Sequence, residues 1–203
     1  MKICQISDIH WRGIQRHEEY TRAFELLFTK LQIIRPDIIL CTGDIFHTKT
    51  AGITPEVIGK LAWMLAGLAE IAPLHVVLGN HDGNLTNTDR QDVITPIVEA
   101  MDNGRIHLYK TSGTYAIAGY PGFNFCAFSC FDKEGWKDVR PIPGEVNIAL
   151  FHGSVSGCET DGLWRLKEGE ASLEFFKSYD FAMLGDIHKQ QFLGCRNHSG
   201  ITR

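Results

Sequence analysis

The sequence predicts an α/β protein whose first half alternates strands with helices and whose second half consists mainly of short strands. Apolar strand-like runs in the first half occupy residues 2–7, 37–44 and 74–82. Helical spacing of apolar residues predicts helices over 18–34, 55–71 and 91–101. This β-α-β alternation is typical of a parallel sheet that is covered by helices.

The first helix illustrates the pattern on which these predictions depend. Its apolar residues recur three or four positions apart, at Tyr20, Ala23, Phe24, Leu27 and Leu31. Pro36 ends the helix, because proline has no backbone N–H and clashes with the preceding turn.

In the second half, strand-like runs follow one another with little helix between them. They cover residues 114–120, 123–131, 146–153 and 180–186, and a short helix is predicted over 173–178. We expect these strands to form a second sheet that is mixed or antiparallel. Residues 153–170 are the longest irregular stretch, which we interpret as a functional surface loop rather than a domain boundary.

The length and composition suit one domain over residues 1–203. A chain of 203 residues can bury roughly 70% of the surface that it exposes when unfolded. It is 44% hydrophobic and 22% charged, as ordinary globular proteins are. The formal net charge of -4 provides no general attraction to nucleic acid, so nucleic-acid binding requires a local basic patch or bound metal cations.

The cysteines and the apolar runs bear on the cellular compartment. Six cysteines form no C-x-x-C pair and several lie in strand-like runs, so we expect reduced packing residues in a cytoplasmic protein. Lys60 and Glu70 interrupt the longest apolar stretch, which is too short to span a bilayer. We therefore expect no membrane association.

Residues that can bind a metal ion follow the ends of five predicted strands. They are Asp8 and His10 in SDIH, Asp44 and His47 in GDIFH, Asn80 and His81 in GNHD, His152 in FHG, and Asp186 and His188 in GDIH. The carboxyl ends of strands are where open α/β sheets bind ligands. Each of these fragments alone is more often a helix cap or a turn. Five such fragments in order, each after an apolar strand, are difficult to explain by the packing of the core.

The chemistry of this set fits a single site. Two divalent cations roughly 4 Å apart need a bridging carboxylate with further oxygen and imidazole ligands, and such a pair can hold both the attacking and the leaving oxygen of a phosphoester. Glycines at 43, 79, 153 and 185 allow sharp turns of the backbone beside these residues. The thiols lie elsewhere in the sequence, which argues against a site of the zinc-finger type.

The ordered motifs D-x-H, G-D, G-N-H-D and G-D-x-H, with a histidine before the last, resemble those of the calcineurin-like metallophosphoesterases over nearly the whole chain. GDIFHT followed by a helix and then by GNHD is most similar to the SbcD-type branch, the nuclease subunits of DNA double-strand-break processing complexes. The resemblance implies a four-layer α-β-β-α sandwich. It also implies a metal-dependent DNA exonuclease or endonuclease that acts in repair or recombination.

The resemblance further implies a role for each motif residue. One metal ion would be bound by Asp8, His10, Asp44 and His188, and a second by Asp44, Asn80, His152 and Asp186. His81 would contact the phosphate and protonate or stabilise the leaving oxygen. His47 would help to position the DNA strand, unless it is simply a polar residue at a strand end.

Two features depart from the family pattern. The last motif usually reads G-H-x-H, and Asp186 replaces its first histidine. A carboxylate is a harder ligand than imidazole, which favours Mn²⁺ or Mg²⁺ over softer metal ions. We therefore expect two divalent ions, Mn²⁺ first, with Mg²⁺, Fe²⁺ or Zn²⁺ as alternatives. The chain also stops at CRNHSGITR, so we expect the nuclease domain of residues 1–203 to be incomplete at its C-terminus and to lack the capping domain that binds DNA.

Partners follow from the same resemblance. DNA is the expected substrate. The sequence contains no Walker-type motif, so an SbcC-type ATPase subunit would be a separate chain. The oligomeric state, a homodimer included, stays open.

Several interpretations remain side by side. Trp11, Arg12 and Arg16 contact nucleic acid or pack within their loop. A basic rim or a solvated loop explains Lys49, Arg90 and Lys189. The histidines outside the motifs, at 17, 75, 107 and 198, are interpreted as surface or strand residues. The alternative enzyme is a phosphodiesterase or phosphatase for a small nucleotide or a phosphoprotein, and the alternative to catalysis is a fold retained as a binding scaffold.

Overall fold

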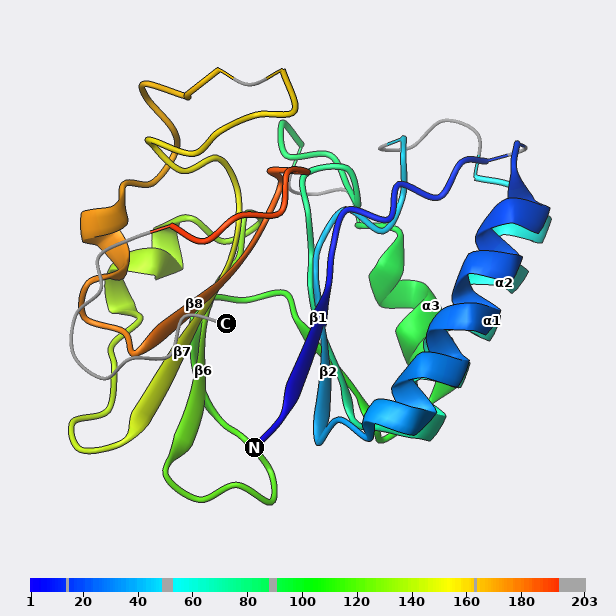
Figure 1. Ribbon diagram of the computed structural model, residues 1–203, viewed down its shortest axis with the longest axis horizontal. Helices are drawn as coiled ribbons and strands as arrows, with labels where there is room; N and C mark the ends of the chain where they lie inside the picture. Colours follow the sequence, from blue (N-terminus) through cyan, green and yellow to red (C-terminus); the bar gives the residue numbers. More distant parts are fainter. Residues whose placement is uncertain (14, 49–52, 88–90, 163, 194–203) are drawn as a thin grey trace.

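Eight strands form two sheets in the computed structural model, which describes residues 1–13, 15–48, 53–87, 91–162 and 164–193 (Figure 1). The first sheet has the order β1 (Ile3–Ile6), β2 (Ile38–Thr42), β3 (Leu74–Val77) and β4 (Ile106–Tyr109), all parallel. The second has the order β5 (Gly113–Ala116), β6 (Phe123–Phe128), β7 (Val146–His152) and β8 (Phe181–Gly185). Strand β5 is antiparallel to β6 and the other pairs are parallel, so the second sheet is mixed.

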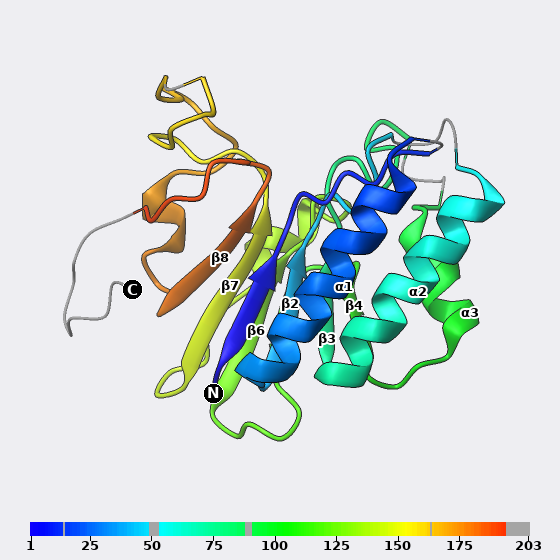
Figure 2. The same cartoon turned by 45° about the vertical axis from the view of Figure 1, so that its right-hand side comes forward.

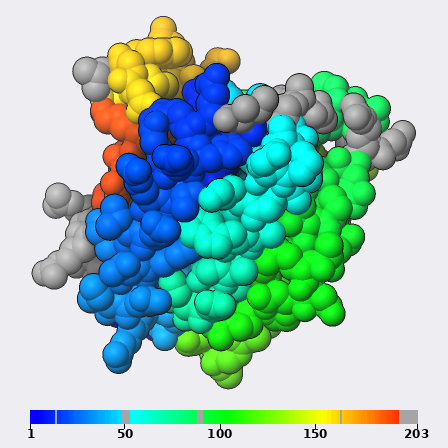
Figure 3. Space-filling view, turned by 90° about the vertical axis from the view of Figure 1, so that its right-hand side faces the viewer, coloured from blue at the N-terminus to red at the C-terminus, as the bar shows by residue number. Residues whose placement is uncertain are grey.

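Three α-helices cover the outer face of the first sheet and lie side by side there (Figures 2 and 3). They are α1 (His17–Ile34), α2 (Pro55–Ile71) and α3 (Ile94–Met101). The outer face of the second sheet packs against the 3-10 helices η1 (Glu134–Asp138) and η2 (Leu173–Phe176) and the aromatic side chains around them. The α/β class with two facing sheets is confirmed. Among the described residues, the layer on the outer face of the second sheet contains short 3-10 helices in place of α-helices.

Strand β2 shows why the two sheets must face each other. All five of its residues are buried, as in strands that are covered on both faces. Ile39 and Cys41 pack with the helices, whereas Ile38 and Leu40 pack against the second sheet. This alternation follows from the two-residue period of a strand.

The predicted elements are close to those of the structure, with three main differences. Helix α3 begins at Ile94 rather than at 91, because Asp92 Oδ1 accepts hydrogen bonds from the backbone N–H groups of Ile94 and Thr95 at 3.0 and 2.7 Å. The segment after Ser172, predicted as a helix over 173–178, is a 3-10 helix over Leu173–Phe176. Strand β4 was not predicted, and it is a four-residue strand that contains a histidine, His107.

The core between the sheets contains a buried histidine. His75 is 4% exposed and lies between His107, whose ring centroid is 4.6 Å away, and Phe125. Its Nδ1 lies 2.8 Å from the hydroxyl of Tyr109. Burial lowers the pKa of His75 to about 4, and the charge of His107 acts in the same direction. His75 is thus a neutral core residue.

Within the described residues, no helix combines the length and the apolar character that crossing a membrane requires.

Candidate metal centre

The five motif segments meet at one edge of the molecule. Each follows the carboxyl end of a parallel strand, β1, β2 and β3 in the first sheet and β7 and β8 in the second, and these ends lie together at the top of Figure 1. Hydrogen bonds between the β1 and β2 loops extend the strand pairing past the strand ends, from Asp8 N to Gly43 O (3.0 Å) and from His10 N to Asp44 O (2.9 Å). The first two motifs are therefore held in register by the backbone.

Glycines allow these loops to approach each other closely. Gly43 has a φ of 94°, which favours glycine. At Gly79 and Gly185 the limiting factor is space: a Cβ on Gly79 would collide with the backbone and carboxylate of Asp44, and a Cβ on Gly185 would lie 2.7 Å from His152 Nδ1. The expectation of sharp turns thus holds for Gly43, whereas Gly79 and Gly185 are required for packing.

Four of the seven predicted metal ligands have a left-handed backbone. Asp8, His10, Asp44 and Asp186 have φ angles of 54°, 49°, 53° and 85°. Such conformations cost of order 1 kcal/mol or more for residues with a Cβ, and they cluster at functional sites. The backbone is therefore strained where the predicted ligands lie.

Asp44 lies at the centre of the site. It is 2% exposed, and its two carboxylate oxygens face different histidines. Oδ2 lies 3.6 Å from His10 Nε2, and Oδ1 lies 3.3 Å from His152 Nε2. Oδ1 also accepts a hydrogen bond from the backbone N–H of His81 at 2.8 Å. A carboxylate placed in this way could offer one oxygen to each of two cations.

The orientation of His152 supports metal binding. Its Nδ1 lies 2.7 Å from the carbonyl oxygen of Thr42, which can only accept, so Nδ1 carries the proton and Nε2 bears a lone pair. His152 is 1% exposed, and Nε2 has no hydrogen-bond partner among the described residues. Two lone pairs thus face each other between His152 Nε2 and Asp44 Oδ1, and a proton or a metal ion is needed there.

Two further atoms show the same need for a cation. Asn80 Oδ1 is buried without a hydrogen-bond partner among the described residues. His10 Nε2 lies 3.1 Å from His188 Nε2, so at most one of these nitrogens can carry a proton directed at the other. Unpaired buried acceptors are costly unless a cation binds them. The residues present therefore fit divalent metal ions.

The charges of the site point in the same direction. Burial lowers the pKa of His152, but the carboxylate of Asp44 beside Nε2 outweighs this effect and raises the pKa to about 9. Burial raises the pKa of Asp186, and Asp44, Asp8 and Glu170 add to this effect while His152 opposes it. Crowded carboxylates around a buried imidazole attract positive charge, which a divalent cation can supply.

The ligand atoms form three overlapping groups in which all atoms lie within 4.8 Å of one another. These groups are Asp8, His10 and His188; His10, Asp44 and His81; and Asp8, Asp44 and His152. Asp186 is in none of these groups among the described residues, but its Oδ1 lies 4.0 Å from His152 Nε2 and its backbone N–H donates to Asp8 Oδ1 at 3.0 Å. Six of the predicted ligands thus lie together, and the seventh, Asn80, lines a cavity with His152 and Asp186.

His81 and His47 stand beside this site. The ring centroid of His81 lies 4.9 Å from that of His10 and 6.4 Å from that of His47. His81 Nδ1 donates to the carbonyl oxygen of His47 at 2.7 Å, because a carbonyl can only accept. The free atom of His81 is therefore Nε2, and the His47 backbone determines this tautomer.

Sequence reasoning missed the structural role of Asp82, the last residue of GNHD. Its side chain is fully buried and accepts three backbone hydrogen bonds, from Ile45 N (2.9 Å) and Phe46 N (3.0 Å) to Oδ1 and from Gly79 N (2.8 Å) to Oδ2. Burial raises its pKa to about 7, against the N–H groups that favour the ionised form. Asp82 ties the loop after β2 to the loop after β3.

The side chains considered as nucleic-acid contacts are mostly engaged elsewhere. Trp11 is 1% exposed and stacks on Tyr20 and Phe24, so the packing interpretation is correct for this residue. Arg16 pairs with Glu19, and Lys189 pairs with Glu159. Lys49, Arg90 and His198 lie outside the described residues.

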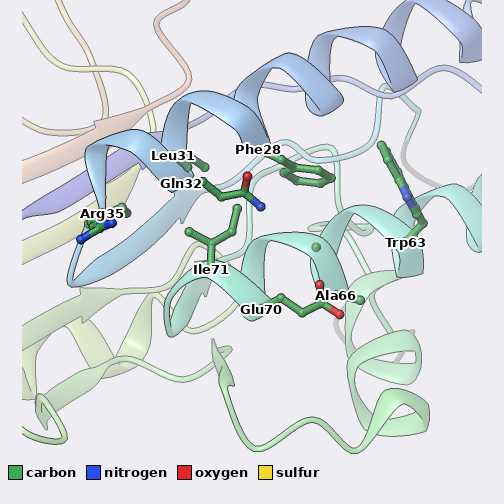
Figure 4. A pocket seen from close by; sticks show the side chains of 10 residues that line it. Phe28, Leu31, Gln32, Arg35, Trp63, Ala66, Glu70 and Ile71 are labelled. Atoms are coloured by element: carbon green, nitrogen blue, oxygen red, sulfur yellow. The ribbon is translucent and has the colours of Figure 1, made fainter.

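Three cavities bear on where a substrate binds. One of about 260 Å³ is lined by the predicted ligands Asn80, His152 and Asp186, together with Glu170. A larger one, about 700 Å³, lies between α1 and α2 and is lined by side chains such as Phe28, Trp63 and Glu70 (Figure 4). The cavity between α1 and α2 contains none of the predicted ligands, whereas a third cavity, of about 580 Å³, is lined by Asp8 and His188. The chemistry therefore belongs to the two cavities that the predicted ligands line.

The fold and the site together define a metallophosphoesterase. Residues 1–190 match the model of the calcineurin-like phosphoesterase family, so the chain belongs to this family of metal-dependent phosphoester hydrolases. The chain is 37% identical over 205 residues to the uncharacterized protein R555 of Acanthamoeba polyphaga mimivirus. This alignment covers 94% of the chain and 15% of that much longer relative.

The chain is also similar to a solved structure, that of the nuclease MPE of Pseudomonas putida. The TM-score is 0.43 and the sequence identity 15%, over 83% of this chain and 72% of that chain.

Proposed function

We propose that the protein is a two-metal phosphodiesterase that cleaves DNA. The observation that carries the proposal is the position of Asp44, whose two carboxylate oxygens face His10 on one side and His152 on the other, at 3.6 and 3.3 Å. In this proposal Asp8, His10, Asp44 and His188 hold one ion, and Asp44, Asn80, His152 and Asp186 hold the other. When bound, two such ions would supply activation of the attacking oxygen and stabilisation of the charge that develops on the phosphate.

The residues of the chain contribute positioning and proton transfer. The hydrogen bond from His81 Nδ1 to the His47 carbonyl fixes the orientation of the imidazole ring. In this proposal His81 Nε2 donates a hydrogen bond or a proton to the leaving oxygen. The backbone N–H of His81 donates to Asp44, so the acid and the bridging carboxylate have a fixed mutual position. Thr42 keeps His152 in the tautomer that a ligand needs.

The nuclease assignment is tested by cleavage of end-labelled linear duplex DNA and circular single-stranded DNA in Mn²⁺. The parent protein is compared with Asp8→Ala and His81→Ala, and we expect cleavage by the parent alone. Loss of a proton donor typically lowers the rate by about 10²- to 10⁴-fold. Equal cleavage by all three proteins would show a contaminating nuclease and would refute the assignment.

A second candidate is a phosphodiesterase for a small nucleotide. It is favoured by the pairing of two lysines near the site, Lys189 with Glu159 and Lys133 with Glu170, because this pairing reduces the positive charge that these two described residues offer to a DNA backbone. Hydrolysis of bis-p-nitrophenyl phosphate without cleavage of either DNA would favour this candidate. Absence of metal binding by calorimetry would favour the non-catalytic scaffold instead.

A further inference from the structure

Glu170 brings a carboxylate into the cavity that the predicted ligands line, although no motif contains it. The lining of the 260 Å³ cavity includes Asn80, His152 and Asp186 and also Glu170 and Ser154. A Cβ on Gly153 would collide with Glu170 Oε2, so this oxygen lies directly against the residue that follows His152. Glu170 is also one of the charges that raise the pKa of Asp186.

The backbone holds Glu170 in this place. Its N–H donates to Ser154 Oγ at 3.1 Å, and the neighbouring Ala171 N–H donates to Ser154 O at 3.1 Å. Val155 and Ala171 form a parallel β-bridge. The two ends of the 153–170 segment are thereby joined, and Glu170 is positioned by the chain that leaves β7.

Lys133 partly neutralises the negative charge of the Glu170 carboxylate. Lys133 Nζ lies 2.6 Å from Glu170 Oε1 and 5.6 Å from the ring centroid of Trp136. Lys133 does not line the cavity, whereas Glu170 does. A substrate in the cavity would therefore contact the carboxylate of Glu170 and not Lys133. The charge of Lys133 would partly offset the repulsion between this carboxylate and an anionic substrate.

We propose that Glu170 is a specificity-determining residue, whose carboxylate favours phosphodiesters, which carry one negative charge, over phosphomonoesters, which carry two. The inference rests on the proposed phosphoester hydrolysis at the neighbouring ligands. A carboxylate repels a dianion more strongly than a monoanion, and one extra unit charge roughly 7 Å away in a water-like dielectric changes an equilibrium about threefold. Lys133 reduces this discrimination, so the two residues act in opposite directions.

The test compares the binding of two phosphonates. Phenylphosphonate, above its second pKa, is a dianion, and its monomethyl ester is a monoanion. Their dissociation constants are measured by calorimetry on the Mn²⁺-loaded protein, together with kcat/KM for bis-p-nitrophenyl phosphate and p-nitrophenyl phosphate. The variants are Glu170→Gln and Lys133→Met. Glu174→Gln is a matched control, because Glu174 also pairs with a lysine, Lys177, at 2.9 Å on the exposed surface.

We expect Glu170→Gln to bind the monoanion about threefold and the dianion about sevenfold more tightly, so that the preference for the monoanion falls about threefold. Lys133→Met should shift this preference in the opposite direction. The control leaves both constants unchanged. Equal selectivity in all proteins, or shifts of the same sign in both variants, would overturn the inference. Opposite shifts in phosphonate binding without hydrolysis of either ester would uphold it and refute the proposed catalytic function instead.

Discussion

The buried carboxylate of Asp82 links the stability of the fold to the geometry of the site, and Asp82→Asn tests this link. The amide can keep its oxygen toward the N–H groups of Ile45 and Phe46, but its NH₂ group then faces the N–H of Gly79, where the carboxylate accepts at 2.8 Å. The variant loses one charge-assisted hydrogen bond and leaves a buried donor unpaired. These losses amount to about 3 kcal/mol of unfolding free energy, or roughly 6–12 °C in Tm for a domain of this size.

The assay is urea unfolding combined with calorimetric titration of Mn²⁺. Because Asp82 ties the Asp44 loop to the Asn80 loop, we expect Asp82→Asn to lower both stability and metal affinity. Asp92→Asn is the matched control, since Asp92 is also buried, at 2% exposed, but caps α3. It should lower stability while leaving metal affinity unchanged. An Asp82→Asn variant with parental stability would refute the assignment of three hydrogen bonds.

Three further predictions concern single residues. Asp186→His should retain phosphoester hydrolysis but shift its metal preference from Mn²⁺ toward Zn²⁺, and an inert variant with intact metal binding would contradict this. The pKa of His75, lowered to about 4, implies stability that is fully present above the unfolded pKa of about 6.5 and declines by up to about 3 kcal/mol as pH falls to about 4. Urea midpoints should therefore depend less on pH in His75→Phe, and an unchanged slope would contradict the assignment. Trp11→Ala should destabilise the fold by about 3–5 kcal/mol, because it removes a buried, stacked ring, and weaker DNA binding at unchanged stability would show a nucleic-acid contact instead.

The sequence was sufficient to predict that the metal-binding residue types after the first three strands lie close together, because they follow strands that are parallel neighbours. Each predicted ligand follows an apolar run, and parallel strands place their carboxyl ends at one edge, so the convergence of Asp8, Asp44 and Asn80 required only the β-α-β pattern. The facing of the second sheet, which adds His152 and Asp186, was implied by family resemblance alone. The spacing of apolar residues in the sequence indicates which residues are buried, but it does not indicate how two sheets pack against each other.

Other features depend on contacts that have no local signal. Trp11 directly follows the first motif, a position from which its ring could contact nucleic acid. In the structure the aromatic side chains of α1 bury it. Glu170 lies far along the chain from any motif, and it reaches the cavity only because the 153–170 segment returns to Ser154. Strand β4 is short and contains His107, whose partner in the neighbouring strand is His75. Such positions follow from tertiary structure.

The number of Mn²⁺ ions bound per chain, measured by calorimetry for the parent and for Asp44→Asn, tests the central claim most directly. The account predicts two ions in the parent and weakened binding of both in the variant, because Asp44 faces His10 with one oxygen and His152 with the other. A single ion in the parent, or an Asp44→Asn variant that binds two ions with parental affinity, would contradict the account.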